Sequence, residues 1–145
     1  MQNLPHNYVV TASAVADGNV KLVSAGLEEI ESAGPAEFGG PGDLWSPETL
    51  LVAAVADCFI LTFRAIARAS KFNWISISCD VDALLDRVAG VSRFTAFQQR
   101  VVLIVAPGTN EAKAMRLLEK AEHGCLITNS LNGASHLAAE VRVAE

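Results

Sequence analysis

The sequence lacks the features of nucleic-acid-binding and membrane-spanning proteins. Only 19% of its 145 residues are charged, and 16 acidic side chains outnumber 11 basic ones, giving a net charge of −5. A mildly acidic chain without a cluster of Lys or Arg is poorly suited to nucleic acid or to an anionic membrane surface. Its longest unbroken apolar stretch, residues 50–56, is far shorter than the ~20 residues of a spanning helix. We therefore expect no nucleic-acid partner and no membrane partner.

Cysteine is also scarce, with Cys58, Cys79 and Cys125 set far apart. Small secreted domains carry dense, even-numbered sets of cysteines, which this chain does not. The first residues show neither the basic nor the apolar segment of a secretory signal. We therefore expect a cytoplasmic protein with reduced thiols, in which any disulfide would be catalytic rather than structural.

The common cofactor and metal motifs are absent from the sequence. It contains no P-loop, no Gly-x-Gly-x-x-Gly after a strand, no Cys-x-x-Cys and no His-Glu-x-x-His. His123 and Cys125 lack two further metal ligands at local spacing. We expect neither a cofactor nor a metal site.

The apolar content of 51% and the length predict one compact domain over residues 1–145. Strands are predicted at 8–15 and 19–25 around an Asp-Gly turn, and a third at 27–31. A glycine-rich loop at 34–42 follows. Ser46 then caps a helix whose residues to about Ala69 are apolar nearly all round, which is typical of a buried central helix.

The second half of the chain alternates apolar and polar residues in two stretches, which predicts strands over 75–82 and 95–105. Asn110 is a candidate cap for a helix that runs to His123 and stops at Gly124. A short helical segment from Cys125 and a closing strand over 137–143 complete the chain. Because strands and helices come in runs, the predicted fold class is α+β.

The three cysteines differ in context. Cys79 lies on the apolar side of an alternating strand, where a thiol packs as a small hydrophobe. Cys58 lies within the apolar helix, which is compatible with a core residue and with a functional one. Cys125 opens a helical turn, where a helix N-terminus lowers a thiol pKa and favours the reactive thiolate. Both readings stay open for Cys125 as well.

Four segments together resemble the signatures of the OsmC/Ohr (organic hydroperoxide resistance) family. They are the glycine-rich Phe-Gly-Gly-Pro-Gly stretch, the helix opening Ser-Pro-Glu-Thr-Leu-Leu, and two cysteine motifs, at residues 38–42, 46–51, 56–59 and 123–131. The order of the predicted elements matches that family over nearly the whole chain.

The resemblance implies a fold of antiparallel sheets around a long buried central helix, in an intertwined homodimer. It also implies a thiol-dependent peroxidase of oxidative-stress defence that reduces organic hydroperoxides, or peroxides more broadly. Cys58 would be the peroxidatic thiol, Cys125 the resolving thiol and Glu48 the active-site glutamate. A disulfide would close the cycle, and an external dithiol would reset it.

Glu48 precedes Cys58 by ten residues, which along a helix is a rise of about 15 Å. It therefore cannot reach Cys58 of its own helix. If both serve one site, a partner chain supplies the glutamate. The alternative is that Glu48 only stabilises the helix N-terminus through its charge.

One position departs from the family pattern. Where hydroperoxide reductases of the family place an arginine before an Asp-Gly turn, this chain has Ala16. Lys21 is the only cation of the first hairpin. A second hypothesis is therefore a non-catalytic dimer that binds a small hydrophobic ligand. A third is a cysteine hydrolase that pairs Cys125 with His123 or His136.

Overall fold

The computed structural model describes residues 2–145, which form two compact units. The first unit ends at Leu50 and the second begins at Leu51. That the whole chain forms a single domain stays a prediction.

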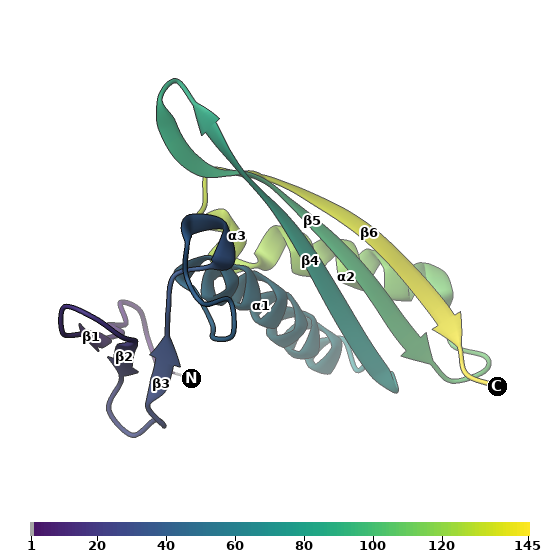
Figure 1. Cartoon of the computed structure of the whole chain (residues 1–145). Helices are drawn as coiled ribbons and strands as arrows, with labels where there is room; N and C mark the ends of the chain where they lie inside the picture. Colours follow the sequence, from purple (N-terminus) through teal and green to yellow (C-terminus); the bar gives the residue numbers. More distant parts are fainter. Residues whose placement is uncertain (1) are drawn as a thin grey trace. The chain divides into compact units, whose positions relative to one another are not determined.

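The first unit is built on a small antiparallel sheet of three strands in the order β1-β2-β3 (Figure 1). Its strands are β1 (Thr11–Ser13), β2 (Val20–Val23) and β3 (Ile30–Ser32). All three were predicted, but each is shorter than its predicted range, and β3 ends one residue beyond it. The turn between β1 and β2 contains Gly18 at φ +99°, a conformation that glycine adopts without strain.

The glycine-rich loop after β3 contains one turn of 3-10 helix, η1 (Ala36–Phe38). The amide of Gly40 donates to the carbonyl of Pro35 at 3.0 Å, which folds the loop back on itself. A Cβ atom at Gly40 would overlap the carbonyl of Gly34. This loop therefore depends on the close approach of two backbone segments at Gly34 and Gly40.

Helix α1 (Pro47–Ala69) begins where the sequence predicts it. The hydroxyl of Ser46 accepts a hydrogen bond from the amide of Thr49 at 3.2 Å, and the Thr49 hydroxyl accepts from the amide of Ser46 at 2.8 Å. This reciprocal pair satisfies donors that the helix start leaves free. Pro47 follows in the first helical position, where its missing amide costs nothing.

The second unit carries a three-stranded sheet in the order β4-β5-β6 (Figure 1). Strands β4 (Ser76–Val88) and β5 (Val91–Val105) form a long antiparallel hairpin, whereas β6 (Ala134–Val143) pairs with β5 in parallel. The expectation of antiparallel sheets is therefore wrong for the β5–β6 pair. Helices α2 (Glu111–Gly124) and α3 (Leu126–Asn129) lie between these strands in the chain and carry it back to the sheet end where β5 begins.

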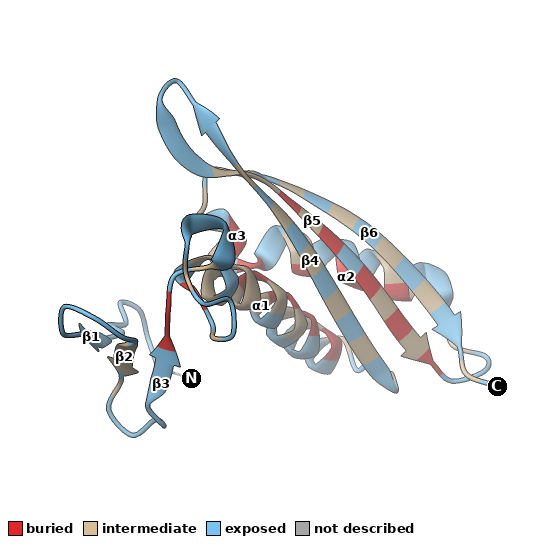
Figure 2. Ribbon diagram, in the orientation of Figure 1, coloured by how far each residue is buried: buried red, intermediate tan, exposed pale blue. Residues whose placement is uncertain are grey.

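The core of the second unit lies between the sheet and helices α1 and α2 (Figure 2). Strand β5 contributes one buried face, as its alternation predicts, and α1 and α2 each contribute one stripe. The buried apolar residues are Phe59, Phe63 and Ala67 from α1, Phe72 after it, Val101, Leu103 and Val105 from β5, and Ala114, Leu117, Leu118 and Ala121 from α2.

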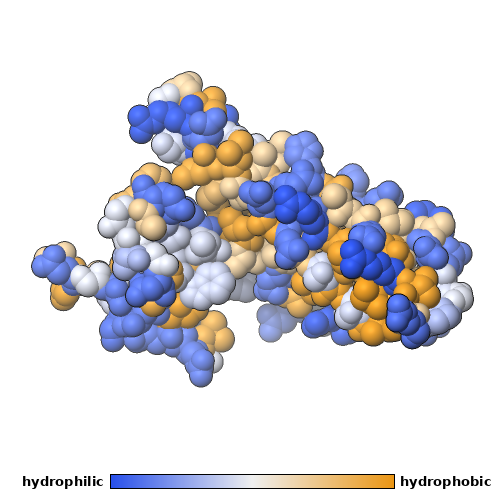
Figure 3. Space-filling view, turned by 45° about the vertical axis from the view of Figure 1, so that its right-hand side comes forward, coloured by the Kyte–Doolittle hydropathy of each residue, from blue (hydrophilic) through white to orange (hydrophobic). Residues whose placement is uncertain are grey.

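Helix α1 is less buried than the sequence suggests. Only the stripe Val55, Phe59, Phe63 and Ala67 is fully buried, while Leu61 remains 49% exposed. Within the single chain the sheet and α2 cover one side of α1 only, so burial all round is not seen without a partner subunit. Apolar surface is consequently exposed on the second unit (Figure 3).

Helix α1 is long and apolar enough to cross a membrane by length and composition alone. Core helices of soluble proteins meet the same criterion. Its buried stripe packs into the shared core with β5 and α2, so α1 contributes one face to the core of the fold.

Helix α2 is capped by Asn110, whose side chain accepts from the amide of Lys113 at 2.9 Å, as predicted. Gly124 is the last helical residue rather than a left-handed stop. The chain leaves the helix instead through Cys125, which has extended backbone angles of φ −69° and ψ 106°. Gly124 has another use, because its missing side chain leaves room beside Thr62 of α1.

Candidate active site

Cys58 lies in the middle of α1 and opens onto a cavity of about 490 Å³. Its sulfur is 3.9 Å from the hydroxyl of Thr62, one turn further along the helix. The wall is mainly apolar and is formed by α1 and the start of α3. Its residues are Ala54, Asp57, Cys58, Leu61, Thr62, Ala65, Ile66, Leu126 and Ile127. The thiol of Cys58 is thus reachable from an apolar hollow.

Cys125 is fully buried at the junction of α2 and α3. Just before it, a Cβ atom at Gly124 would stand 3.4 Å from the Thr62 methyl group, so the end of α2 packs closely on α1. This packing makes Cys58 and Cys125 neighbours, and the nearby Cys58 raises the pKa of the Cys125 thiol. Both cysteines are free thiols.

Burial raises the pKa of the Cys125 thiol above its ordinary value, because the surroundings disfavour the thiolate. Hydrogen bonds from the hydroxyl and the amide of Thr128 act in the opposite direction, while Cys58 raises the pKa further. The Thr128 hydroxyl oxygen is buried and has no hydrogen-bond partner of full geometry among residues 2–145. That hydroxyl is therefore available to the sulfur of Cys125.

Cys79 occupies the place that the alternation of its strand predicts. It lies on β4, packs against the core and is absent from the cavity wall. Burial raises the pKa of its thiol to about 11, with smaller contributions from the charges of Asp80 and Cys125. We assign it to packing.

Glu48 and Cys58 are not brought together within one chain. Both lie on α1, ten residues apart, which is about 15 Å along a straight helix. One carboxylate oxygen of Glu48 is buried and has no hydrogen-bond partner among the described residues. A buried acceptor of this kind is normally paired, so residues 2–145 of the single chain leave Glu48 without an expected donor.

The cavity beside Cys58 has no basic lining residue. Lys21, the cation of the first hairpin, is bound to the Glu29 carboxylate at 3.1 Å, and this contact raises the pKa of Lys21. Arg93 lines a different cavity of about 270 Å³, together with Phe94 and Phe97. The charged group that does line the cavity is Asp57. Asp57 belongs to the first cysteine motif, at residues 56–59, but the sequence assigned it no role.

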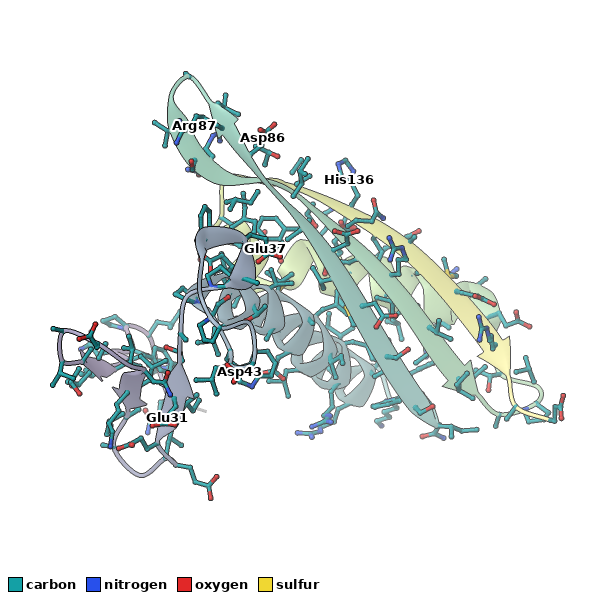
Figure 4. All side chains as sticks on the ribbon, in the orientation of Figure 1. Glu31, Glu37, Asp43, Asp86, Arg87 and His136 are labelled. Atoms are coloured by element: carbon teal, nitrogen blue, oxygen red, sulfur yellow. The ribbon has the colours of Figure 1, made fainter. Side chains whose placement is uncertain are left out.

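The histidines do not pair with Cys125. His123 is exposed, and its Nδ1 donates to the carbonyl of Glu119 at 2.8 Å, back along its own helix. His136 is exposed on β6 and points away from the helices (Figure 4). Nothing in this arrangement supports the hydrolase hypothesis. Within residues 2–145, no three His, Cys, Asp or Glu side chains converge as metal ligands.

A family model described as "OsmC-like protein" matches residues 40–140, which is more than half of the chain. The chain belongs to the OsmC-like family. The matched segment contains both Cys58 and Cys125, so the neighbouring thiols lie within the part of the chain that defines the family.

Two curated relatives resemble this OsmC-like chain at low identity. YmaD of Bacillus subtilis, an uncharacterised protein, is 26% identical over 112 residues and aligns with 75% of each chain. An organic hydroperoxide resistance protein of Xanthomonas axonopodis pv. citri is 28% identical over 135 residues, covering 89% of this chain and 92% of the relative.

Solved structures show the same OsmC-like fold. An OsmC-like protein of unknown function from Vibrio cholerae superimposes with a TM-score of 0.84 at 15% identity, covering 95% of this chain and all of that one. An organic hydroperoxide resistance protein OsmC from Legionella pneumophila gives a TM-score of 0.69 at 26% identity, with 97% and 100% covered.

Proposed function

We propose that this OsmC-like protein is a cytoplasmic thiol peroxidase that reduces organic hydroperoxides through Cys58 and Cys125. The observation that carries the proposal is the juxtaposition of two thiols of different accessibility. Cys58 opens onto an apolar cavity, and Cys125 is buried beside it. The similarity to organic hydroperoxide resistance proteins supports the same chemistry.

In the first step of the proposed cycle, the Cys58 thiolate attacks the terminal oxygen of a hydroperoxide ROOH. The O–O bond breaks, Cys58 becomes a sulfenic acid, and the alcohol ROH leaves after taking up a proton. The apolar wall of Leu61, Ala65 and Leu126 suits a bulky organic group better than hydrogen peroxide.

In the second step, the Cys125 thiolate attacks the sulfur of the sulfenic acid. A disulfide forms and water leaves with the proton that Cys125 has lost. An external dithiol then reduces the disulfide and is itself oxidised. The cycle needs no cofactor and no metal.

We also propose that the protein acts as a homodimer in which Glu48 is supplied across the interface. The half-exposed apolar side of α1 supports this assembly. So does the buried oxygen of Glu48, which lacks a donor in the single chain. In a dimer, Glu48 of the partner subunit can approach a Cys58 that its own helix keeps about 15 Å away.

Dithiol-dependent turnover of cumene hydroperoxide tests the proposal. We expect turnover by the wild type, a loss of at least about 100-fold in Cys58→Ser because the nucleophile is gone, and near-normal rates in Cys79→Ser. In Cys125→Ser the sulfenic acid should accumulate and react with dimedone.

Full activity of Cys58→Ser would refute the assignment. Absence of turnover in the wild type would favour the alternative of a dimer that only binds a small hydrophobic ligand. Faster turnover of hydrogen peroxide than of cumene hydroperoxide would contradict the preference for organic substrates.

A further inference from the structure

The cavity of about 270 Å³ that Arg93 lines reaches helix α1 through Leu51. The cavity beside Cys58 reaches the same helix through residues that include Ala54 and Leu61. Steps of three and four residues along α1 connect Leu51, Ala54, Cys58 and Leu61, so all four lie on one side of the helix. The two cavities therefore meet the same side of α1, and none of these four side chains is fully buried in the single chain.

The proposed homodimer fixes how two copies of this helix meet. A contact between identical subunits related by a two-fold axis is reciprocal. If Glu48 of one subunit approaches Cys58 of the partner subunit, then Cys58 of the first approaches Glu48 of the partner subunit. These two pairings stand at opposite ends of one helical segment about 15 Å long. The two segments must therefore run side by side in opposite directions.

This arrangement carries the second cavity to the reactive thiol. Leu51 follows Glu48 by three residues on α1, a rise of about 4.5 Å toward Cys58. Leu51 of the partner subunit then stands within about one helical turn of Cys58, measured along the axis. The cavity that Leu51 shares with Arg93 comes with it. Arg93 of the partner subunit is thereby brought to the Cys58 cavity.

The charges of the two cavities are complementary. The wall beside Cys58 contains the carboxylate of Asp57 and no basic residue, whereas the wall beside Leu51 contains Arg93 and no acidic residue. A thiolate at Cys58 would add a second negative charge to the first wall. A guanidinium that enters from the partner subunit would offset both charges.

Arg93 is free to make this contact. It is exposed and lies on the part of the β4–β5 hairpin that extends beyond β6, because β6 pairs with β5 only from Ala96 onward (Figure 1). Asp86 stands opposite Arg93 on β4. Even so, Arg93 forms no ion pair with Asp86 or with any other acidic side chain of residues 2–145.

We propose that Arg93 of the partner subunit is the cation that stabilises the Cys58 thiolate, so that each active site takes its positive charge from the hairpin of the other chain. This inference rests on the proposed peroxidase and its homodimer. Arginine stays protonated at every working pH and can approach two anions at once through its planar fork. Arg93 thus favours the nucleophilic form of Cys58 and moves no proton itself.

The size of the effect follows from Coulomb's law. Opposite unit charges about 6 Å apart, at effective dielectric constants between 20 and 80, favour the thiolate by about 3- to 100-fold. Loss of the guanidinium should therefore move the ionisation of Cys58 to higher pH by about 0.5 to 2 pH units.

Alkylation of Cys58 by iodoacetamide across a range of pH, followed by mass spectrometry of the Cys58 peptide, tests the inference without any peroxide. Arg93→Ala should move the alkylation profile to higher pH by that amount, while Arg93→Lys keeps the charge and should stay near the wild type. Arg87→Ala, on the same hairpin and in neither cavity wall, is the matched control and should change nothing. Sedimentation velocity should show that Arg93→Ala is still a dimer.

A mixed dimer of a Cys58→Ser chain and an Arg93→Ala chain shows which subunit supplies the arginine. Its one remaining Cys58 lies in the chain without Arg93 and faces the Arg93 of the other chain. We expect this Cys58 to have the wild-type alkylation profile. A profile like that of Arg93→Ala would mean that Arg93 does not act across the interface, and would overturn the inference.

Two further results would overturn it, whether or not the protein turns over peroxide. One is an unchanged profile in Arg93→Ala, and the other is dissociation of that variant into monomers, which would assign Arg93 to subunit association. A shifted profile in a protein without peroxide turnover would instead refute the peroxidase function and leave Arg93 as the cation of the Cys58 thiolate.

Discussion

Thr128 connects the local structure of α3 to the chemistry of Cys125. Cys125 immediately precedes α3, and both the amide and the hydroxyl of Thr128 favour its thiolate. Burial outweighs them, so the pKa of Cys125 is raised overall. In the proposed cycle Cys125 must ionise before it attacks the sulfenic acid. The balance between burial, which raises its pKa, and Thr128, which lowers it, therefore governs the second step.

Resolution of the sulfenic acid should therefore speed up as the pH rises. A raised pKa keeps Cys125 protonated at neutral pH, and its thiolate fraction grows about tenfold per pH unit until the pKa is passed. Thr128→Val removes the hydroxyl donor, so the profile should move to still higher pH and the neutral rate should fall by about tenfold. Rapid-mixing kinetics of disulfide formation after a peroxide pulse measure this.

Thr128→Ser is the control, since it keeps the hydroxyl and should restore both the rate and the profile. If the valine variant resolves with the wild-type pH profile, the hydroxyl does not serve Cys125.

At the scale of single elements, the loop around η1 depends on two glycines that are not equivalent. A Cβ at Gly40 would overlap the Gly34 carbonyl, whereas a Cβ at Gly34 would lie 3.9 Å from the Gly40 Cα, an ordinary contact. Gly34 and Gly40 both lie outside the left-handed region. Alanine at these two positions therefore differs in the steric overlap of the added Cβ and not in left-handed backbone strain.

Gly40→Ala should destabilise the protein by about 2–4 kcal/mol, because the backbone must move apart. Gly34→Ala should stay within about 1 kcal/mol of the wild type. Denaturant unfolding monitored by the fluorescence of Trp45 and Trp74, with circular dichroism as a second probe, measures the difference. Equal stability of the two variants would contradict the close approach.

Elements whose signals are local were predictable from the sequence. The Ser46 and Asn110 caps, the start of α1 and the buried face of β5 follow from cap chemistry and from period-two alternation. The parallel pairing of β5 with β6 was not predictable, because strand order depends on where α2 and α3 return the chain. The side of α1 that the single chain covers was not predictable for a related reason, since apolar composition does not say which surface covers it.

The candidate site likewise combines residues that sequence motifs predict and residues that only the three-dimensional arrangement brings into view. Motif resemblance proposed Cys58, Cys125 and Glu48, and the structure makes the two thiols neighbours. The resolving role of Cys125 and the role of Glu48 stay predictions. Asp57 and Thr128 lie within the two cysteine motifs, but the motifs assign them no role, because what each can do depends on which groups stand beside it in space.

At the scale of the whole molecule, the proposed dimer makes each site depend on two chains. In such an assembly Cys58 of one subunit works with Glu48 of the partner subunit. A Cys58→Ser chain paired with a Glu48→Gln chain then still builds one complete site out of two.

This mixed dimer should recover activity that neither variant shows alone. Co-expression with two different affinity tags and purification through both isolates the mixed species, which should have about half the wild-type activity per dimer. If Glu48 served the Cys58 of its own chain, both sites would be defective and no activity would return. A monomer in sedimentation velocity would exclude the arrangement at once.

The unequal burial of the two sulfurs also fixes the direction in which the disulfide can be reopened. An external dithiol can reach Cys58 from the cavity, whereas Cys125 has no exposed surface. Cys125 is therefore the leaving group of that exchange, and a thiol with a raised pKa leaves slowly. In the proposed cycle the oxidised protein is thus the long-lived form, and the supply of reductant rather than of peroxide sets the pace of turnover.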